Sequence, residues 1–534
     1  MSTYAALEID YARVQQHSET EVLIQRTAFT KETSYRCSFI TLKCNETDEG
    51  TSILSPGAKE TPIFMNAYRA LLPRGASSLH RSPDGRYIAF YIPATQARGA
   101  HTFGVMDTTD LSIYTKTEPV AYWDLLSEGL LRYYHFSPDS KTLLYLSDTK
   151  DHSTLYEVNM TQLGLKGTEL PSTRLFSREY SVVDLVWKDN DTIFYIANRD
   201  NPYAWALYEL TLSTYNLRKI ADNVSYADNL WLKGEKLLFA QNDAQGLRPA
   251  LYNTRTETLE YFQLPKWDTV TTQGQVVETL TEGLTGIFLL EESGQSDTLV
   301  IWLHGGPYRQ AAEEYHPYWS YGGYDWMLEK LRRADVGILK LDYPGSFGFG
   351  RLFAESITGG IGTIDAEKSA AAIANFAARN NYEKVYVVGN SYGGYLSLKL
   401  LVDNPNLIDG ALSINGVMDW MTLLENLGNS IFNVQFHGTA NDTNRELYRT
   451  ASIYNYADNI TDQKVVLVHG ENDTTIPYEQ SRGLATFLSY TGVPVNLVTM
   501  PGEDHVFKKP MSFETLCKTL FQFTDRSTTK SCEL

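Results

Sequence analysis

One serine lies in a setting that would make it a nucleophile. The segment 385–395 reads VYVVGNSYGGY, so Ser391 follows an apolar, valine-rich run and has glycines on both sides. The run is typical of a buried strand, and residues 396–402 have a helical pattern. A serine in the sharp turn of a strand–Gly-x-Ser-x-Gly–helix unit is typical of hydrolase nucleophiles. We predict a strained turn, because side chains at the flanking glycine positions would collide with the strand and the helix.

Serine is a weak nucleophile and requires a base and a carboxylate. The apolar run 465–468 leads into a loop that contains Asp473, and 495–500 leads into a loop that contains His505. Serine, acid and histidine therefore follow one another in the order of this class, at strand ends expected on one edge of a sheet. We predict His505 as general base and Asp473 as the group that fixes its tautomer.

Other residues compete for these two roles. His469 stands at a strand end and is expected to be structural, and His437 belongs to a polar insertion with no strand before it. Three neighbouring carboxylates are the alternatives to Asp473, namely Glu471, Glu503 and Asp504.

An acyl-transfer site also needs donors for an oxyanion. The amide of Tyr392, which follows the serine, is one candidate. The second is expected in the loop His304-Gly305-Gly306-Pro307, which follows the apolar run 300–303. Glycine lets a backbone N–H come close to the oxyanion, so Gly305 and Gly306 are predicted donors; a plain glycine turn is the alternative.

Strands that alternate with helices must position these residues. Apolar runs after residue 276 alternate with alanine- and leucine-rich helical segments such as 364–378 and 479–489. This alternation predicts an α/β-hydrolase domain over 276–534, with a doubly wound, mostly parallel sheet and Ser391 at the end of a central strand. The predicted strands are 298–303, 336–341, 384–388, 410–414, 464–468 and 495–499.

The first half has a different periodicity, with short β-type runs and turn signals. Four segments resemble one another, each with a strand, a tight polar turn and an aromatic-rich strand: 78–91, 134–145, 184–195 and 229–239. Their spacing of about 45 to 55 residues is that of propeller blades. We predict an all-β propeller of five or six blades over 1–275, with residues 1–15 either in it or packed on the hydrolase. A β-sandwich is the alternative.

Composition excludes several classes of partner. With 46 basic and 64 acidic residues the formal net charge is −18, so neither nucleic acid nor an anionic membrane surface is expected to bind. No stretch reaches the roughly 18 uninterrupted apolar residues of a membrane span, and the start does not have the pattern of a signal peptide. We expect a cytoplasmic protein, whose oligomeric state is open between monomer and homo-oligomer.

The four cysteines are too few and too scattered to predict a disulfide framework: Cys37, Cys44, Cys517 and Cys532. Cys37 and Cys44 have a spacing that would allow a disulfide or a metal site, but free thiols are expected.

The chain resembles the prolyl oligopeptidase family of serine peptidases, in particular its acylaminoacyl-peptidase and dipeptidyl-peptidase branches. The stretches that carry the resemblance follow the family's order: 304–307, 342–350, 389–394, 452–459, 469–477 and 501–507. The resemblance implies an N-terminal propeller above the active site, with Ser391, Asp473 and His505 as the triad.

The resemblance also implies a pocket for the residue before the scissile bond. Val417, Trp420 and Ile476 stand where relatives have apolar lining, although ordinary core packing is the alternative. Two residues beyond the acid, where relatives often have Arg or Asn to hold a substrate carbonyl, this chain has Thr475. In addition, Asp342-Tyr-Pro replaces Asn-x-Arg, the propeller is short, and no Glu-Glu pair for a peptide amino terminus is found in it.

These residues predict a serine hydrolase that cleaves short peptides or small amides through an acyl-enzyme. An esterase or specialised amidase acting on a small acyl compound is the alternative, and a catalytically silent propeller scaffold is a third. Because triad chemistry takes its nucleophile, base and electrophile from the protein, neither a metal nor an organic cofactor is expected.

Overall fold

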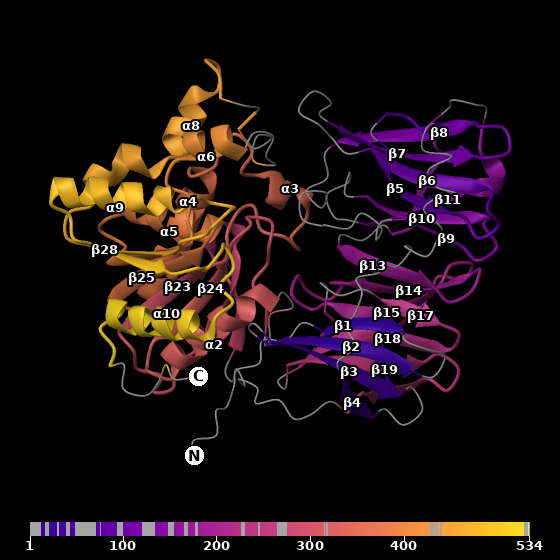
Figure 1. The fold of residues 1–534 in the computed structure, drawn as a ribbon, viewed down its shortest axis with the longest axis horizontal. Coiled ribbons are helices and arrows are strands. Elements are labelled where there is room, and N and C mark those ends of the chain that lie inside the picture. The colour runs from indigo at the N-terminus through magenta and orange to yellow at the C-terminus, as the bar shows by residue number, and fades with distance from the viewer. Residues whose placement is uncertain are drawn as a thin grey trace.

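The computed structural model shows two units side by side, one of β-sheets and one of a sheet with helices (Figure 1). It describes residues 12–16, 21–28, 31–38, 43–47, 71–74, 76–92, 100–119, 134–147, 154–164, 169–176, 180–225, 230–243, 246–263, 275–313, 316, 319–427, 432, 436–437, 440–527 and 532. Residues 1–11 therefore lie outside the described part, and with them most of the segment 1–15.

The first unit contains five four-stranded sheets within the described residues, each in sequential antiparallel order. The first sheet has β1 (Ala12–Gln16), β2 (Glu21–Ala28), β3 (Lys31–Ser38) and β4 (Cys44–Thr47). The second has β5 (Ser77–Arg81), β6 (Tyr87–Ile92), β7 (Ala100–Asp107) and β8 (Ile113–Pro119), and the third has β9 (Tyr134–Phe136), β10 (Thr142–Ser147), β11 (Thr154–Asn159) and β12 (Thr173–Arg174). The last two consist of β13 (Val182–Trp187), β14 (Thr192–Ala197), β15 (Ala206–Thr211) and β16 (Asn216–Ala221), and of β17 (Trp231–Lys233), β18 (Lys236–Asp243), β19 (Gly246–Asn253) and β20 (Thr258–Tyr261).

All four predicted hairpins are confirmed, and each forms the first two strands of a sheet. Polar side chains hold their turns. Ser82 Oγ donates to Asp84 Oδ1 at 2.6 Å, and Ser137 makes the same bond to Asp139 at 2.7 Å. The repeated Ser-Pro-Asp sequence therefore stabilises the turn, because the aspartate accepts a hydrogen bond from the serine two residues before it.

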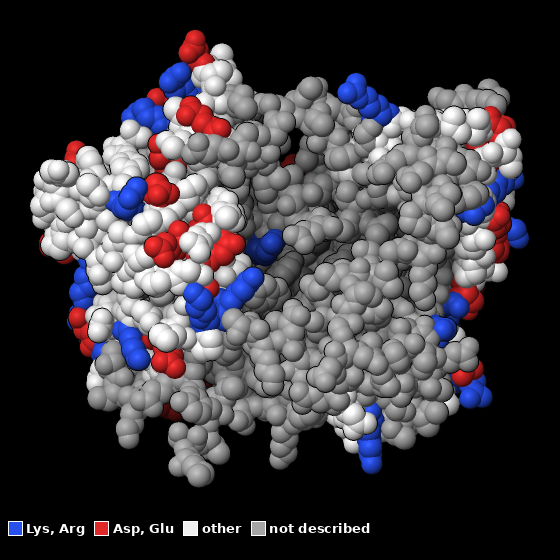
Figure 2. Space-filling model, in the orientation of Figure 1, with Lys and Arg blue, Asp and Glu red and all other residues white. Residues whose placement is uncertain are grey.

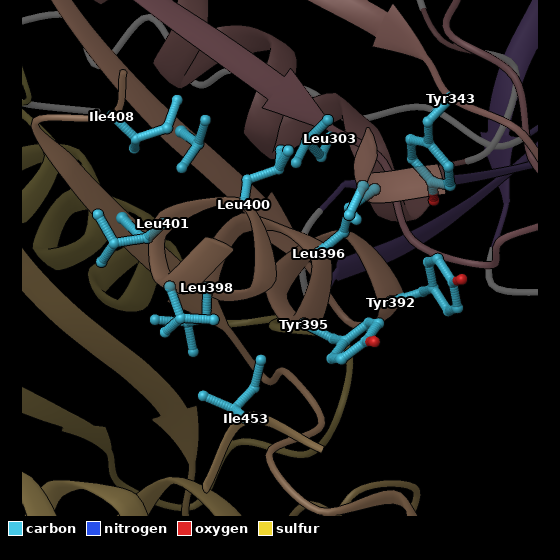
Figure 3. Close-up of a cluster of buried hydrophobic side chains, with 14 of the residues drawn as sticks. Leu303, Tyr343, Tyr392, Tyr395, Leu396, Leu398, Leu400, Leu401, Ile408 and Ile453 are labelled. Atoms are coloured by element: carbon cyan, nitrogen blue, oxygen red, sulfur yellow. The ribbon is translucent and has the colours of Figure 1, made fainter. Parts of the chain in front are cut away.

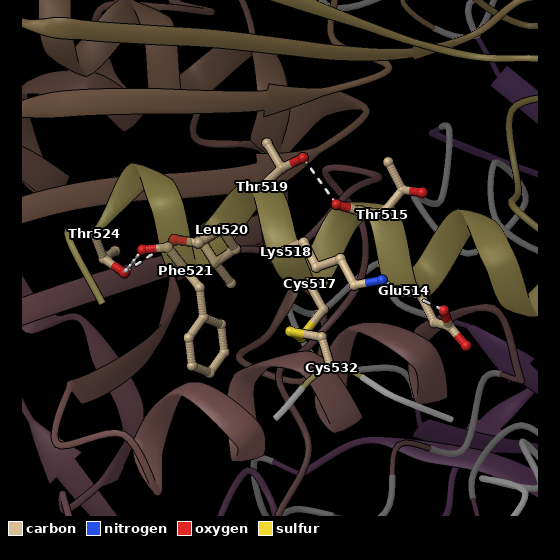
Figure 4. Close-up of a disulfide and its surroundings, with 9 residues drawn as sticks. All are labelled: Glu514, Thr515, Cys517, Lys518, Thr519, Leu520, Phe521, Thr524 and Cys532. Carbon is tan, nitrogen blue, oxygen red and sulfur yellow. Dashed lines mark hydrogen bonds and ion pairs between the residues drawn. A yellow bond between two sulfur atoms is a disulfide. The ribbon is translucent and has the colours of Figure 1, made fainter. Parts of the chain in front are cut away.

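The expectation of free thiols is wrong, because the four cysteines form two disulfides. Cys37 and Cys44 are directly paired across β3 and β4, with Cα atoms 4.0 Å apart. Cys517 bonds to Cys532 across a separation of 15 residues (Figure 4). The spacing of Cys37 and Cys44 allowed a disulfide without requiring one, and the pairing of Cys517 with Cys532 depends on how the segment after α10 folds back onto that helix.

The second unit is built on an eight-stranded sheet of order β21-β22-β24-β23-β25-β26-β27-β28. β21 and β22 are antiparallel to their neighbours, and the six strands from β24 to β28 in this order are parallel, which confirms a mostly parallel sheet. The two antiparallel strands at one side of the sheet, β21 (Gln275–Thr279) and β22 (Thr285–Leu289), were not predicted. The predicted strands are β23 (Thr298–Leu303), β24 (Gly337–Asp342), β25 (Lys384–Asn390), β26 (Gly410–Ile414), β27 (Lys464–Gly470) and β28 (Val495–Met500).

Helices cover both faces of this sheet and bury two apolar layers. One layer contains α4 (Ile364–Arg379), α5 (Tyr392–Asp403), α6 (Trp420–Leu427) and α9 (Glu479–Thr491), and the other contains α2 (Gly322–Arg332) and α10 (Pro510–Phe523). α5 is buried on nearly every side, and its leucines contact both the sheet and the helices (Figure 3). The shorter helices are α3 (Arg351–Glu355), α8 (Arg445–Ala451) and the 3-10 segments η3 (Met160–Gln162), η4 (Thr281–Gly283), η5 (Trp319–Tyr321) and η6 (Ile453–Asn459).

Within the described residues, no helix has both the length and the apolar character that crossing a bilayer requires. On the face shown in Figure 2, the acidic and basic side chains of the α/β unit are intermingled.

The disulfide at α10 gives a stability prediction. Removing it with Cys517→Ser and Cys532→Ser should lower the free energy of unfolding by about 3 kcal/mol, because a 15-residue loop is released in the unfolded chain. Urea unfolding followed by tryptophan fluorescence measures this loss, with Cys37→Ser/Cys44→Ser as the matched pair in the other unit. Four reactive thiols in the denatured, unreduced wild-type protein would contradict both disulfides.

Candidate active site

Ser391 lies at the turn between β25 and α5 in a conformation that side chains rarely adopt, with φ of 55°. Its amide donates to the Ile414 carbonyl at 2.8 Å. A methyl group on Gly389 would lie 2.4 Å from the Gly393 backbone, and one on Gly393 would lie 2.0 Å from the Leu303 carbonyl oxygen. The predicted strain and the need for flanking glycines are therefore confirmed.

The structure brings Asp473 and His505 to this serine. His505 Nε2 lies 3.0 Å from Ser391 Oγ, and His505 Nδ1 lies 2.7 Å from Asp473 Oδ2. The other carboxylate oxygen of Asp473 accepts the amides of Thr475 and Ile476, both at 2.8 Å. Burial works to raise the pKa of Asp473, but bonds from His469 and His505 and the Ile476 amide hold it well below its usual range. The carboxylate therefore stays ionised and orients the imidazole.

The competing residues have other partners. His469 is buried and binds Ser481 Oγ and the Ile476 carbonyl, so it supports the Asp473 loop, as a structural histidine would. His437 is exposed and lies against Gly359. Of the alternative acids, Glu471 is exposed, Asp504 binds the Thr474 and His505 amides, and Glu503 binds the amides of Lys508 and Lys509.

The predicted glycine loop lies directly beside the serine, and a methyl group on Gly305 would be 3.1 Å from Ser391 Cβ. The Gly305 amide, however, donates to the Tyr321 hydroxyl at 2.9 Å. The Gly305 amide therefore already has a hydrogen-bond acceptor in the protein, whereas the sequence analysis predicted that it would donate to an oxyanion. Tyr392 is the first residue of α5, so the helix does not use its amide.

These groups surround a cavity of about 240 Å³. The predicted pocket residues Val417, Trp420, Thr475 and Ile476 all line it. Ring and aliphatic side chains that the sequence analysis did not single out add to its apolar wall, namely Tyr321, Tyr324, Leu423 and Phe432. No motif in the sequence indicates that these residues lie close to Ser391 in space.

Sequence analysis missed two further polar residues, Arg309 in the cavity lining and Asn415 beside the loops of the site. Arg309, two residues beyond the His-Gly-Gly-Pro stretch, contributes a cation to the lining. Asn415 has φ of 50° and joins the two loops of the site, because its side chain donates to the His505 carbonyl at 2.8 Å and accepts the Gly470 amide at 2.9 Å. The sequence feature that could have indicated Asn415 is its position directly after the predicted strand 410–414.

A buried carboxyl lies behind the nucleophile turn. Asp365 of α4 is fully buried and accepts a hydrogen bond from the Tyr392 hydroxyl at 2.7 Å. Burial raises the pKa of Asp365 to about 6, against the opposing effect of that hydroxyl and of neighbouring amides. A group that titrates near neutral pH therefore contacts the residue next to Ser391.

Residues 319–531 match the model of the prolyl oligopeptidase family. Over 477 residues, which are 85% of this chain and 67% of the relative, the sequence is 23% identical to dipeptidyl-peptidase 5 of Porphyromonas gingivalis.

Solved structures show the same fold. A puromycin-hydrolyzing peptidase of Mycobacterium tuberculosis superposes with a TM-score of 0.68 at 17% identity, over 96% of this chain and 78% of that one. The acylaminoacyl peptidase of Pyrococcus horikoshii superposes with a TM-score of 0.58 at 15% identity, over 97% and 96% of the two chains. The likeness extends across both units.

Asp365 gives a prediction on pH. Because its folded pKa lies above its unfolded value, its contribution to stability is fully present below about pH 4 and is lost as the pH rises through about 6. From pH 4 to pH 8 the wild-type protein should therefore lose about 3 kcal/mol of unfolding free energy relative to Asp365→Asn. Urea unfolding at each pH measures this difference, with the exposed Asp462→Asn as control. Parallel pH profiles of wild type and Asp365→Asn would rule the effect out.

Proposed function

We propose that the chain is a serine peptidase of the prolyl oligopeptidase family, which cleaves short peptides or small amides through an acyl-enzyme; the match of residues 319–531 to that family supports this. The observation that carries the proposal is the continuous set of contacts from Asp473 Oδ2 through the His505 ring to Ser391 Oγ, at 2.7 and 3.0 Å. Those distances suit proton transfer from serine to histidine without rearrangement.

In the proposed mechanism, Ser391 Oγ attacks the substrate carbonyl carbon while His505 Nε2 takes the hydroxyl proton. The imidazolium is stabilised by Asp473, whose low pKa keeps it anionic. His505 then gives the proton to the leaving amine, and the carbon–nitrogen bond breaks to leave an ester on Ser391. A water molecule repeats the sequence on this ester, with His505 again as base, and releases the acid.

We propose the amides of Tyr392 and Gly306 as donors to the oxyanion. Both residues line the cavity that contains Ser391, and Tyr392 occupies a helix position whose amide is not used by the helix. The Gly305 amide donates to the Tyr321 hydroxyl in the cavity wall, so Gly305 would contribute indirectly, by positioning Tyr321. Each such donor contributes on the order of 3 kcal/mol to the stability of the transition state.

The cavity favours an apolar side chain on the acyl side of the scissile bond. Val417, Trp420 and Ile476 are buried and line it, and its volume of about 240 Å³ suits a proline, alanine or larger hydrophobic group. Arg309 lies in the same lining, and we propose that it holds a substrate carbonyl in place of the donor that Thr475 does not supply.

The five sheets of the first unit are proposed to form a propeller that caps the cavity, with a boundary to the hydrolase near residue 275. Neighbouring sheets are joined turn to turn, which supports a radial arrangement. The Asp84 amide donates to Ser140 Oγ, and the Asp139 amide donates to Asn190 Oδ1, both at 3.0 Å. Such a lid would exclude folded proteins and admit short peptides.

The cellular setting is part of the proposal. Two disulfides favour an oxidising compartment rather than the cytoplasm expected from the sequence, because thiols are kept reduced in the cytoplasm. The proposed chemistry draws every reacting group except the hydrolytic water from the protein, so we propose neither a metal nor an organic cofactor.

Replacing the nucleophile tests the reaction class. Ser391→Ala should lower kcat by at least a thousandfold, and on the order of a millionfold by analogy with other serine enzymes. It should also abolish labelling by a fluorophosphonate probe. Ser397→Ala, in the helix that follows the serine turn, is the matched control and should label as the wild type does. Equal labelling of Ser391→Ala and wild type would disprove hydrolase chemistry at this serine.

A panel of chromogenic substrates separates peptidase from esterase. We expect hydrolysis of p-nitroanilides with an apolar residue at the scissile bond, because the cavity wall is apolar. A preference for dipeptides with a free amino group would support a dipeptidyl peptidase, and a preference for N-acylated residues an acylaminoacyl type. Turnover of p-nitrophenyl esters alone would overturn the peptidase proposal in favour of an esterase.

A further inference from the structure

One loop of the β-sheet unit reaches the residues around the predicted oxyanion loop. It spans 198–205 and joins β14 to β15. The Tyr203 hydroxyl donates a short hydrogen bond to Asp342 Oδ2 and lies 3.1 Å from Thr285 Oγ1. Burial and the adjacent Asp342 carboxylate raise the pKa of Tyr203 well above its usual range, so the phenol keeps its proton and remains a donor.

The same loop is packed tightly on the α/β unit. The Trp205 ring stacks on Phe347 with centroids 5.5 Å apart, and its Nε1 donates to Gln310 Oε1 at 3.0 Å. Asn198 Nδ2 donates to the Gly348 carbonyl at 3.0 Å. These groups are buried, so their hydrogen bonds fix the two units in one relative position near the site.

Asp342 transmits this contact to the glycine loop. Its side chain is fully buried at the end of β24, and its Oδ1 accepts the Ala311 amide at 2.8 Å. The same oxygen lies 3.2 Å from His304 Nε2. His304 and Ala311 stand on either side of Gly305 and Gly306, so the carboxylate that Tyr203 binds holds both ends of the loop.

We propose that Tyr203 is a positioning residue, through which the β-sheet unit holds the oxyanion loop in its reactive geometry. This inference rests on the proposed function. Without the phenol, a fully buried carboxylate loses one of its donors, and the groups around it shift to replace that donor. Oxyanion donors act only when well placed, and a displacement of about 1 Å can cost a hundredfold in rate.

The position of Tyr203 has a consequence for the reaction. The docked arrangement of the two units supplies the hydroxyl to Asp342, so the geometry of the oxyanion loop depends on the β-sheet unit as well as on the α/β unit.

Tyr203→Phe tests this role. We expect kcat to fall about tenfold to a hundredfold with KM changed by no more than about twofold, because the substrate pocket is untouched. The rate of fluorophosphonate labelling should fall by the same factor, since its phosphoryl oxygen uses the same donors. Tyr145→Phe is the matched control, because it removes a tyrosine hydrogen bond to Ser172 Oγ, at 2.9 Å, that lies wholly within the β-sheet unit.

A double variant separates positioning from general destabilisation. Asp342→Asn removes the charge that needs the phenol, so Tyr203→Phe should cost much less in the Asp342→Asn background than alone. Multiplicative effects, or a loss of kcat in Tyr145→Phe as large as in Tyr203→Phe, would overturn the proposal, as would unchanged kcat in a folded Tyr203→Phe. An unreactive wild-type protein would instead refute the proposed function itself.

Discussion

The first turn of α5 packs on the backbones of β23 and β25 with no side chain between them. Gly389 and Gly393 allow this approach, because a methyl group at either position would lie 2.4 Å or less from a backbone atom. The contact fixes the serine turn against Leu303, the last residue of β23. Since the glycine loop begins at the next residue, one packing contact sets the position of both the proposed nucleophile and the proposed oxyanion donors.

Three buried aspartates around this contact show how local donors decide what a carboxylate does. Asp473 accepts two amides and an imidazole, and its pKa is held low. Asp365 is deeper, and burial raises its pKa to about 6. Asp342 is enclosed by the Tyr203 hydroxyl and the Ala311 amide, one from each unit. The same side chain therefore binds an imidazole, titrates near neutral pH, or joins two units, according to what surrounds it.

The serine turn, the two partner loops and six of the eight strands could be predicted from the sequence, because each depends on a local pattern: an apolar run for a strand, and a glycine, acid or histidine in the loop after it for the site. It did not reveal β21 and β22. In β21, exposed Val276 and Val277 are adjacent, so the alternation that predicts a half-buried strand is missing.

Long-range contacts were beyond prediction for a different reason. The pairing of Cys517 with Cys532, the approach of Tyr321 to Gly305, and that of Tyr203 to Asp342 depend on how elements fold onto one another. No spacing in the chain encodes them. The sequence showed that Asp342 stands where the family pattern has another residue. The structure gives a physical reason for an aspartate there, because its carboxylate accepts the Tyr203 hydroxyl.

Glu503, one of the alternatives to Asp473, connects the histidine loop to α10 instead of binding His505. Its carboxylate accepts the amides of Lys508 and Lys509 and the Ser512 hydroxyl, just where that helix begins. His505 therefore lies in a loop whose two ends are joined by the Glu503 side chain. The conformational entropy of this loop is lost when the protein folds. Binding of a substrate therefore does not have to order the imidazole of His505.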